Sequence, residues 1–208
     1  MFFSATLDGA VGRLARAYTH DAVLHEVESA HETVDGLDHR FVQVESRSKV
    51  EALVELLEHD GELTLVFVRT KRGADRLVHK LKQKGVAAEA LHGDMPQRAR
   101  QRALVRFESG KARVLVATDV AARGLDLERI SHVVNYDPPQ DDKGYVHRVG
   151  RTARAGRTGT GITLVTADQQ GDVGRMAARL DLNEAFEEDG MKVAPPQVVF
   201  SASASGRR

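Results

Sequence analysis

Four arginines and a histidine lie close together in one segment, with no acidic residue among them. Residues 145–157 contain these arginines and His147, but neither Asp nor Glu. A guanidinium group presents a planar fork of donors that suits phosphate oxygens. On a helix, Arg151 and Arg154 share one face, one turn after His147, and Gly150 leaves room for another surface. The spacing favours a phosphate clamp over a solvated basic helix.

A second segment places a hydroxyl and a carboxylate at the end of an apolar run. Residues 114–119 read as a buried strand that ends in Thr118 and Asp119, and residues 120–126 follow as a turn or short helix. In open parallel sheets, ligands bind beyond the carboxyl ends of the strands. The pattern therefore predicts a ligand at residues 118–126.

Several motifs, taken in order, give the chain a close resemblance to the DEAD-box RNA helicases of superfamily 2. The resemblance extends to about residue 181 and implies a RecA-like fold, which is an α/β domain with a parallel sheet and helices on both faces. The segments resembling motifs III, IV, the HGD and QxxR elements, V and VI are residues 4–6 (SAT), 65–71 (LVFVRTK), 91–94 (LHGD) with Gln97 and Arg100, 114–126 (VLVATDVAARGLD) and 147–154 (HRVGRTAR).

The apolar pattern independently predicts alternating strands and helices, which implies a parallel sheet. The predicted strands are residues 41–44, 63–68, 87–91, 114–118, 132–135 and 161–166. Helices are expected between them, and three carry apolar stripes at helical spacing, namely Val50, Leu53, Val54 and Leu57; Ala74, Leu77, Val78 and Leu81; and Ala103, Leu104 and Phe107. Gly85 is expected to end the second of these helices.

The resemblance implies a set of nucleotide contacts. Arg151 and Arg154 resemble the arginine fingers that reach the γ-phosphate of ATP. Asp126, with Gly124 beside it, resembles the carboxylate that contacts the ribose. His147 resembles the residue that connects the nucleotide site to motif III, although a histidine at a helix start can equally be structural.

The resemblance also implies an RNA track and contacts between two domains. Phe67 resembles an aromatic that packs on an arginine of motif VI, and Arg148 is expected to be an internal ion-pair partner. Ser4 and Thr6 of motif III are assigned, with Phe67, to interdomain coupling. The residues that match the RNA track are Arg69, Thr70, Gly93, Gln97, Arg100, Thr118 and Asp119.

Two positions leave a structural alternative. Asp94 is expected to cap the helix that follows it, with Pro96 in the first turn, so Gln97 could be its capping-box partner as well as an RNA contact. Ala153 stands where glycine is commoner in motif VI. If this segment is helical, alanine should stiffen it slightly.

The sequence lacks two motifs that ATP hydrolysis requires in this family. No segment fits Gly-x-x-x-x-Gly-Lys-Ser/Thr, and no Asp-Glu-Ala-Asp is present. In the family both lie in a first domain, upstream of motif III. The resemblance therefore implies that ATP with Mg²⁺ binds against a missing amino-terminal RecA-like domain, which would hold the metal. No metal site is expected in this chain, which should be inactive alone.

Four regions follow from this interpretation. Residues 1–27, with a helix over 9–18, would be the end of the missing first domain, and residues 28–38 an interdomain linker. Residues 39–183 would form the helicase domain. Residues 184–208 have a composition that cannot bury enough apolar surface, which predicts a disordered tail, with a short partner-binding tail as the alternative.

Composition and charge are consistent with this assignment. The chain has 208 residues, no Cys, no signal peptide and no apolar run that could span a membrane, so a cytoplasmic protein is expected. Its net charge is zero, yet residues 21–62 hold 12 acids and 3 bases, whereas residues 69–113 hold 13 bases and 4 acids. Aromatic residues make up only 5%, which favours sugar and phosphate contacts over base stacking.

Two other functions remain open at this stage. The chain could be a non-catalytic module that binds nucleic acid, or part of a superfamily 2 helicase that acts on DNA. The wording of motifs V and VI favours the RNA branch.

Overall fold

The described part of the chain forms two units, residues 1–32 and 33–208. The structure is a computed structural model and describes residues 9–20, 23, 36–59, 62–123, 125, 127, 129–153, 157–188 and 190–192.

The smaller unit contains one described helix, α1 (Gly9–Tyr18), over the residues predicted to be helical. Two of its apolar side chains are exposed, because Leu14 retains 51% and Tyr18 retains 82% of its accessible surface. The assignment of residues 1–27 to a preceding domain stays a prediction.

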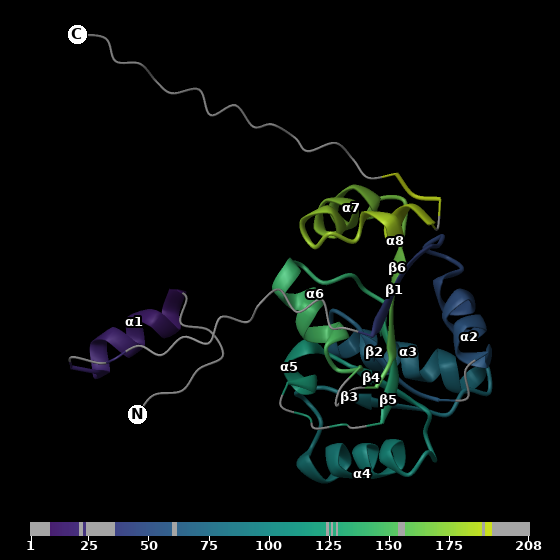
Figure 1. Ribbon diagram of the computed structural model, residues 1–208. Helices are drawn as coiled ribbons and strands as arrows, with labels where there is room; N and C mark the ends of the chain where they lie inside the picture. Colours follow the sequence, from purple (N-terminus) through teal and green to yellow (C-terminus); the bar gives the residue numbers. More distant parts are fainter. Residues whose placement is uncertain are drawn as a thin grey trace. The chain divides into compact units, whose positions relative to one another are not determined.

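Six parallel strands form the sheet of the larger unit, in the order β1-β6-β5-β2-β4-β3 (Figure 1). All six predicted strands are present, and β1, β5 and β6 begin two to four residues earlier than predicted. The bounds are Leu37–Gln43 (β1), Leu63–Phe67 (β2), Ala88–Leu91 (β3), Val114–Ala117 (β4), Ile130–Asn135 (β5) and Gly159–Val165 (β6).

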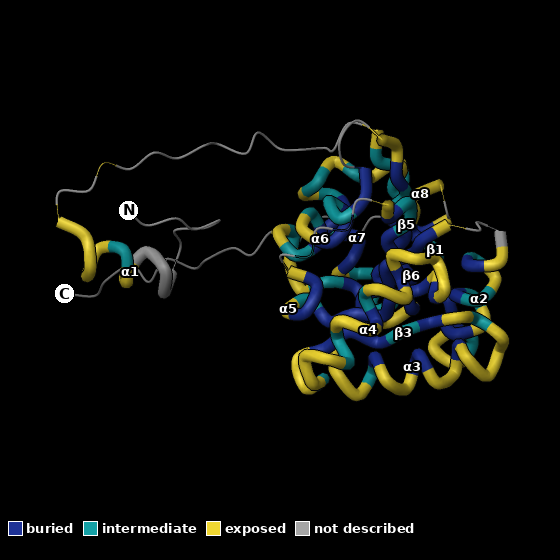
Figure 2. The backbone as a smooth tube through the Cα atoms, turned by 90° about the horizontal axis from the view of Figure 1, so that it is seen from below, coloured by how far each residue is buried: buried dark blue, intermediate teal, exposed yellow. Residues whose placement is uncertain are grey.

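Helices cover both faces of this sheet, so the predicted fold class is confirmed. Alternate residues of a strand point to opposite faces, and Val66 accordingly joins a different apolar cluster from Leu65 and Phe67. Helices α2 (Lys49–His59) and α3 (Lys71–Gln83) pack in the first cluster. Helices α4 (Gln97–Glu108) and α5 (Asp119–Ala122) pack in the second. Figure 2 shows the buried strands enclosed by helices whose outer sides are exposed.

A third apolar cluster extends the domain beyond its predicted end. Helices α6 (Asp142–Val149), α7 (Gln170–Arg179) and α8 (Asn183–Glu188) pack there against Phe41 of β1. Phe186 is fully buried and Met191 is 2% exposed. The disordered tail predicted from residue 184 is therefore wrong over its first residues, because these two apolar side chains anchor the segment. Residues 193–208 lie outside the described residues.

One predicted helix end is confirmed and one is wrong. Gly85 follows Lys84, the cap residue of α3, with a φ of +81°, a left-handed conformation that favours glycine. The residue that precedes α4 is Pro96, and no side chain caps this helix. The carboxylate of Asp94 instead bonds to the ammonium of Lys71 at 2.6 Å. The predicted Asp94 cap, and with it the capping-box alternative for Gln97, is therefore wrong.

A line of polar side chains runs through the domain to its β1 edge. The Asn135 amide donates to the Thr163 hydroxyl at 3.0 Å, Thr163 bonds to the Tyr145 hydroxyl, and that hydroxyl lies 2.7 Å from Nδ1 of His39. Burial raises the pKa of Tyr145 and lowers the pKa of His39. Burial therefore favours the neutral form of both groups.

We expect this pair to make the larger unit less stable in mild acid. Because the folded state lowers the pKa of His39 below 6.5, the unfolded state binds more protons below that pH. The contribution is complete above pH 6.5 and is lost as pH falls through the lowered pKa of the folded state. Urea unfolding is measured at about pH 7.5 and about pH 5.5. The free energy of unfolding should fall less between these two pH values in His39→Phe than in wild type. The variant His79→Gln, at an exposed histidine, is the control. The prediction is refuted if the free energy of unfolding falls by the same amount in His39→Phe as in wild type.

Candidate nucleotide and RNA site

The predicted RNA-track residues gather at one edge of the sheet. In a parallel sheet, the carboxyl ends of all strands lie at the same edge. Each segment that follows β2, β3 or β4 contributes to this edge, and α4 begins there. The residues brought together are Arg69 and Thr70 after β2, Gly93 after β3, Gln97 and Arg100 in the first turn of α4, and Thr118 and Asp119 after β4.

Arg148 is the buried centre of this edge. Its side chain is 5% exposed, and it donates to both carboxylate oxygens of Asp119, at 2.6 and 2.8 Å. The same guanidinium donates to Oδ1 of Asn135 at 3.1 Å and to the backbone carbonyl of Asp137 at 2.7 Å. This arrangement agrees with the expected internal ion pair, and it joins α6, α5 and the end of β5.

Phe67 contacts the same arginine from β2. The guanidinium of Arg148 lies 5.0 Å from the centre of the Phe67 ring. This cation–π contact is the one expected from the sequence between an aromatic of motif IV and an arginine of motif VI. It links a third strand end to Arg148, whereas the part of Phe67 in interdomain coupling stays a prediction.

Asp137 fixes the backbone of Arg69. One carboxylate oxygen accepts a hydrogen bond from the Arg69 amide at 2.8 Å, and the other lies 3.9 Å from the Lys49 ammonium. Lys49 is buried and lies over the Tyr136 ring, 4.9 Å from its centre. Burial lowers the pKa of Lys49, and the nearby carboxylate of Asp137 opposes this shift. The start of α2 therefore helps to hold a predicted RNA contact in place.

Thr70 and Gly93 form a second part of the edge. The Thr70 hydroxyl accepts a hydrogen bond from the Gly73 amide at 3.0 Å and caps α3. At Gly93, an added Cβ would lie 3.6 Å from Cε of Lys71, which is ordinary contact, so the glycine leaves this surface open. The adjacent His92 is buried and bonds through Nε2 to Asp75 on α3 at 3.0 Å. These contacts join the HGD segment to the first turns of α3.

The arginine-finger segment follows directly after α6. The Arg151 Nε donates to the His147 carbonyl at 3.1 Å, and the His147 side chain is exposed. Thr152 is fully packed, with its hydroxyl donating to the Ile130 carbonyl at 2.6 Å. Thr152 thus anchors the segment to β5. The preceding residue, Arg151, is half-buried.

Ala153 is not helical, so the stiffening expected of a helical alanine does not apply. Helix α6 ends at Val149, and Ala153 has a φ of +53°. This left-handed conformation is costly for a side chain with a Cβ and favourable for glycine. The preference for glycine at this place in motif VI therefore has a backbone reason.

Several predicted site residues lie outside the described residues. They are Ser4, Thr6, Gly124, Asp126 and Arg154. Their roles stay predictions.

Three residues at the site were missed in the sequence. Asn135 ends a buried strand, Asp137 precedes two prolines, and Lys49 begins a helix. A polar amide at the end of an apolar strand was the one available signal, because a buried amide requires partners. Lys49 carried no such signal, since lysines at helix starts are usually solvated.

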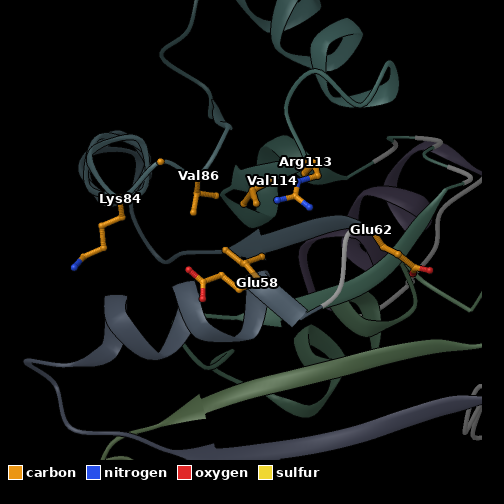
Figure 3. Close-up of a pocket in the computed structure, with 8 residues that line it drawn as sticks. Glu58, Glu62, Lys84, Val86, Arg113 and Val114 are labelled. Carbon is orange, nitrogen blue, oxygen red and sulfur yellow. The ribbon is translucent and has the colours of Figure 1, made fainter.

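Two cavities of the larger unit are lined by none of the predicted site residues. One, of about 200 Å³, opens at the opposite edge of the sheet between the ends of α2 and α3, where Glu58, Val86 and Arg113 line it (Figure 3). Another, of about 470 Å³, lies at the carboxyl ends of β1 and β6. Within the described residues, no three metal-ligating side chains gather, and none of the helices is long and apolar enough to cross a membrane.

Comparisons with known proteins agree with the motifs. Residues 48–156 match the family model of the helicase conserved C-terminal domain. The DEAD-box ATP-dependent RNA helicase CshA of Geobacillus kaustophilus is 42% identical over 174 residues, which are 83% of this chain and 37% of that protein. CshA of Bacillus subtilis is 44% identical over 167 residues, or 80% of this chain and 34% of that protein. The chain thus spans about a third of the length of these relatives.

Solved structures show the same fold. Escherichia coli SrmB, in complex with the regulator of ribonuclease activity A, has a TM-score of 0.63 and 41% identity, covering 67% of this chain and 85% of that one. A variant of Saccharomyces cerevisiae Dbp5, bound to RNA and ADP BeF3, has a TM-score of 0.72 and 32% identity, covering 93% of this chain and 50% of that one. The RecA-like fold is therefore confirmed, and the chain belongs to the DEAD-box helicase family, whose conserved C-terminal helicase domain it carries.

Proposed function

We propose that this chain is the second half of the catalytic core of an ATP-dependent RNA helicase. It would supply the arginine fingers Arg151 and Arg154 and half of the RNA track, and act together with a preceding RecA-like domain. The curated relatives carry the name of ATP-dependent RNA helicases, and one solved relative is bound to RNA and a nucleotide. RNA and ATP are accordingly the proposed partners, and the cytoplasm is the proposed location.

The observation that supports this function most directly is the buried position of Arg148. Its hydrogen bonds and its contact with Phe67 hold the segments of motifs IV, V and VI together. Arg69 would contact RNA on one side of this cluster, and Arg151 follows Arg148 by three residues, just beyond the end of α6. RNA and nucleotide would therefore contact one continuous, rigid cluster of side chains.

The residues present fit the role of completing an ATP site rather than that of holding its metal. Bound ATP supplies the terminal phosphoryl group that is transferred to water. Arg151, at the end of α6, would place a guanidinium against the charge that spreads over the phosphoryl oxygens. The described residues offer no cluster of acids for Mg²⁺, so the metal is assigned to the preceding domain.

On the RNA side, positive charge and hydroxyl groups would contact the backbone without reading sequence. Thr70 offers a hydroxyl at the start of α3, and Arg100 offers a guanidinium in the first turn of α4. Gly93 leaves space for a phosphate next to Lys71. Asp119 has its carboxylate paired with Arg148, so its part in this track is first to position its neighbours.

Arg100→Ala in the full-length protein tests the RNA track. Removal of one phosphate contact should weaken RNA binding about equally for different sequences and lower the salt slope of the affinity by about one unit. ATP turnover at saturating RNA should stay near that of wild type. Fluorescence anisotropy at several salt concentrations and a phosphate-release assay measure the two properties.

Three results would reject the function. Full-length wild type that showed no RNA-stimulated ATP hydrolysis would leave a non-catalytic module. Stimulation by DNA but not RNA would assign the chain to a DNA helicase. Turnover by residues 1–208 alone, abolished by Arg151→Ala, would show that no preceding domain is required.

A further inference from the structure

Helices α3 and α4 carry rows of cations that lead away from the predicted RNA track. On α3, Arg72, Arg76 and Lys80 recur every fourth residue, so they lie on one side of the helix about 6 Å apart along its axis. On α4, Arg98 and Arg102 have the same spacing. All five residues are exposed. These five residues are called the basic edge below.

The basic edge flanks the edge strand β3. Strand β3 is last in the sheet order, and both α3 and α4 pack against it. Glu89 of β3 bonds to Arg106 of α4 at 2.8 Å and lies 3.9 Å from the ammonium of Lys82 on α3. Glu89 thus lies between the two helices, and helical spacing places Lys82 on the β3 side of α3, away from Lys80. Figure 2 shows α3, β3 and α4 side by side at this margin of the domain, with exposed outer turns.

The cations of the basic edge form no salt bridge with an acid in the described part of the chain. Some exposed cations elsewhere are paired, as Arg47 is with Glu45, and Arg179 with Asp142. No salt bridge joins any of the five to a described acid, and the side chain of Arg76 bonds only to the Arg72 carbonyl. Lys80 does act on Glu51, whose pKa is lowered mainly by its hydrogen bond with Lys84. Apart from the attraction between Lys80 and Glu51, the positive charge of the basic edge is therefore not neutralised by acids of the described residues.

This spacing is unfavourable for the helices themselves. Like charges four residues apart on a helix repel and destabilise it. A polyanion along the rows would remove this repulsion and release its own counterions. The first turns of both helices lie at the predicted RNA track, because Thr70 caps α3 and Arg100 lies in the first turn of α4. The rows thus continue from the track outward.

We propose that the basic edge is a second RNA-binding surface, which takes the backbone of RNA that extends beyond the track. This inference rests on the proposed function of the track, and it adds a separate contact for longer RNA. The surface would bind phosphates without base readout, since the described helices present no exposed aromatic side chain there. Longer RNA would therefore bind more tightly than a strand that fills the track alone.

The test measures how affinity depends on RNA length. Oligouridylates of increasing length are titrated against the chain of residues 1–208 by fluorescence anisotropy. Wild type should show a first gain in affinity as the track fills and a second gain with longer strands. The variant Arg72→Gln/Arg76→Gln/Lys80→Gln keeps helix propensity. It should lose most of the second gain, and its salt slope with long RNA should fall by about two units.

Matched controls separate this effect from a change in net charge. The control Arg40→Gln/Arg47→Gln/Lys192→Gln removes the same charge at the β1 side of the sheet, where α8 packs on β1. The pair Arg98→Gln/Arg102→Gln is compared with Arg40→Gln/Lys192→Gln in the same way. Both controls should keep the second gain. If neither basic-edge variant differs from its control with long RNA, the proposal is wrong.

A chemical footprint gives an independent readout. Acetylation of Lys80, followed by mass spectrometry, should slow in the presence of long oligouridylate but not of the shortest one, with Lys192 as the internal reference. Equal protection of both lysines, or no protection of Lys80, would overturn the proposal. Slower acetylation with an acidic protein but not with RNA would assign the surface to a protein partner instead.

The outcome is separable from the proposed function. RNA-stimulated ATP hydrolysis in the full-length protein decides the function of the track. The dependence of affinity on RNA length and the acetylation footprint decide whether the basic edge binds RNA. If ATP turnover is stimulated by RNA but longer RNA gives no second gain in affinity, the proposed function stands and the basic edge is not an RNA-binding surface.

Discussion

Arg151→Ala in the full-length protein should lower RNA-stimulated ATP turnover by about 10³–10⁵-fold, the usual effect of an arginine finger. The guanidinium would act mainly as charge redistributes over the γ-phosphate in the transition state. RNA binding without nucleotide should therefore stay near that of wild type. Arg151 is half-buried at the end of α6, and Thr152 anchors the following backbone to β5, so the substitution should leave the fold intact.

A phosphate-release assay at saturating RNA, together with anisotropy in the absence of nucleotide, measures the two properties. Arg40→Ala serves as the control, because this exposed arginine lies in β1, at the edge of the sheet away from the basic edge. Lowered RNA affinity combined with unchanged saturated turnover would mean that motif VI is part of a basic binding surface. The finger assignment would then be rejected.

Asp119→Ala should destabilise the larger unit by about 3–5 kcal/mol, because it leaves a buried guanidinium without its counter-ion. The Arg148 side chain is 5% exposed, whereas Asp119 is 44% exposed. Arg148→Met should cost less, about 1–3 kcal/mol, since it leaves neutral acceptors and a carboxylate that water can reach. The two halves of one ion pair are therefore expected to differ in their effect on the free energy of unfolding.

Urea unfolding of the single variants and of Asp119→Ala/Arg148→Met measures the interaction between the two residues. The free energy of unfolding of the double variant should lie within about 1 kcal/mol of that of Arg148→Met. The reason is that the double variant no longer contains the unpaired guanidinium of Arg148. Asp172→Ala on α7 is the control. Its partner Arg175 is 40% exposed, so the loss should be under about 1 kcal/mol. Additive effects of the two single substitutions would contradict a buried ion pair.

The arrangement of Arg148 distinguishes this arginine from the others of its segment. Arg151 lies at the surface end of α6, whereas Arg148 turns toward the strand ends and satisfies four acceptor atoms. A buried charge requires partners of this kind. Arg148 therefore positions the site, and contact between the segment that follows it and a phosphate belongs to the proposed function.

The fold was predictable from the sequence because its signals are local. Strand β2 is an uninterrupted run of buried residues, and the stripe of Ala74, Leu77, Val78 and Leu81 follows helical spacing. Such periodicity depends on a few neighbouring residues and on burial of one side. The motifs were also local, so the segments that form the carboxyl edge of the sheet could be named before their positions were known.

The pairing of side chains across the sheet was decided by the tertiary structure alone. Arg148 meets Asp119, Asn135 and Asp137, which are 29, 13 and 11 residues away in the chain. The strand order places β5 beside β2, and the chain alone does not state that order. The contacts of Lys49 with Asp137 follow from the same neighbourhood.

Two local predictions were wrong for the same physical reason. Asp94 has the residue type of a helix cap but bonds to Lys71, which the end of β2 brings close to the end of β3. The acidic and polar composition after residue 183 predicted a tail, yet Phe186 and Met191 fill a gap beside Phe41. Composition and motifs determined the elements, the carboxyl edge and the family of this chain. The partners of each polar or apolar side chain depend on which distant surfaces the sheet brings within a few ångströms, and only the tertiary structure decides that.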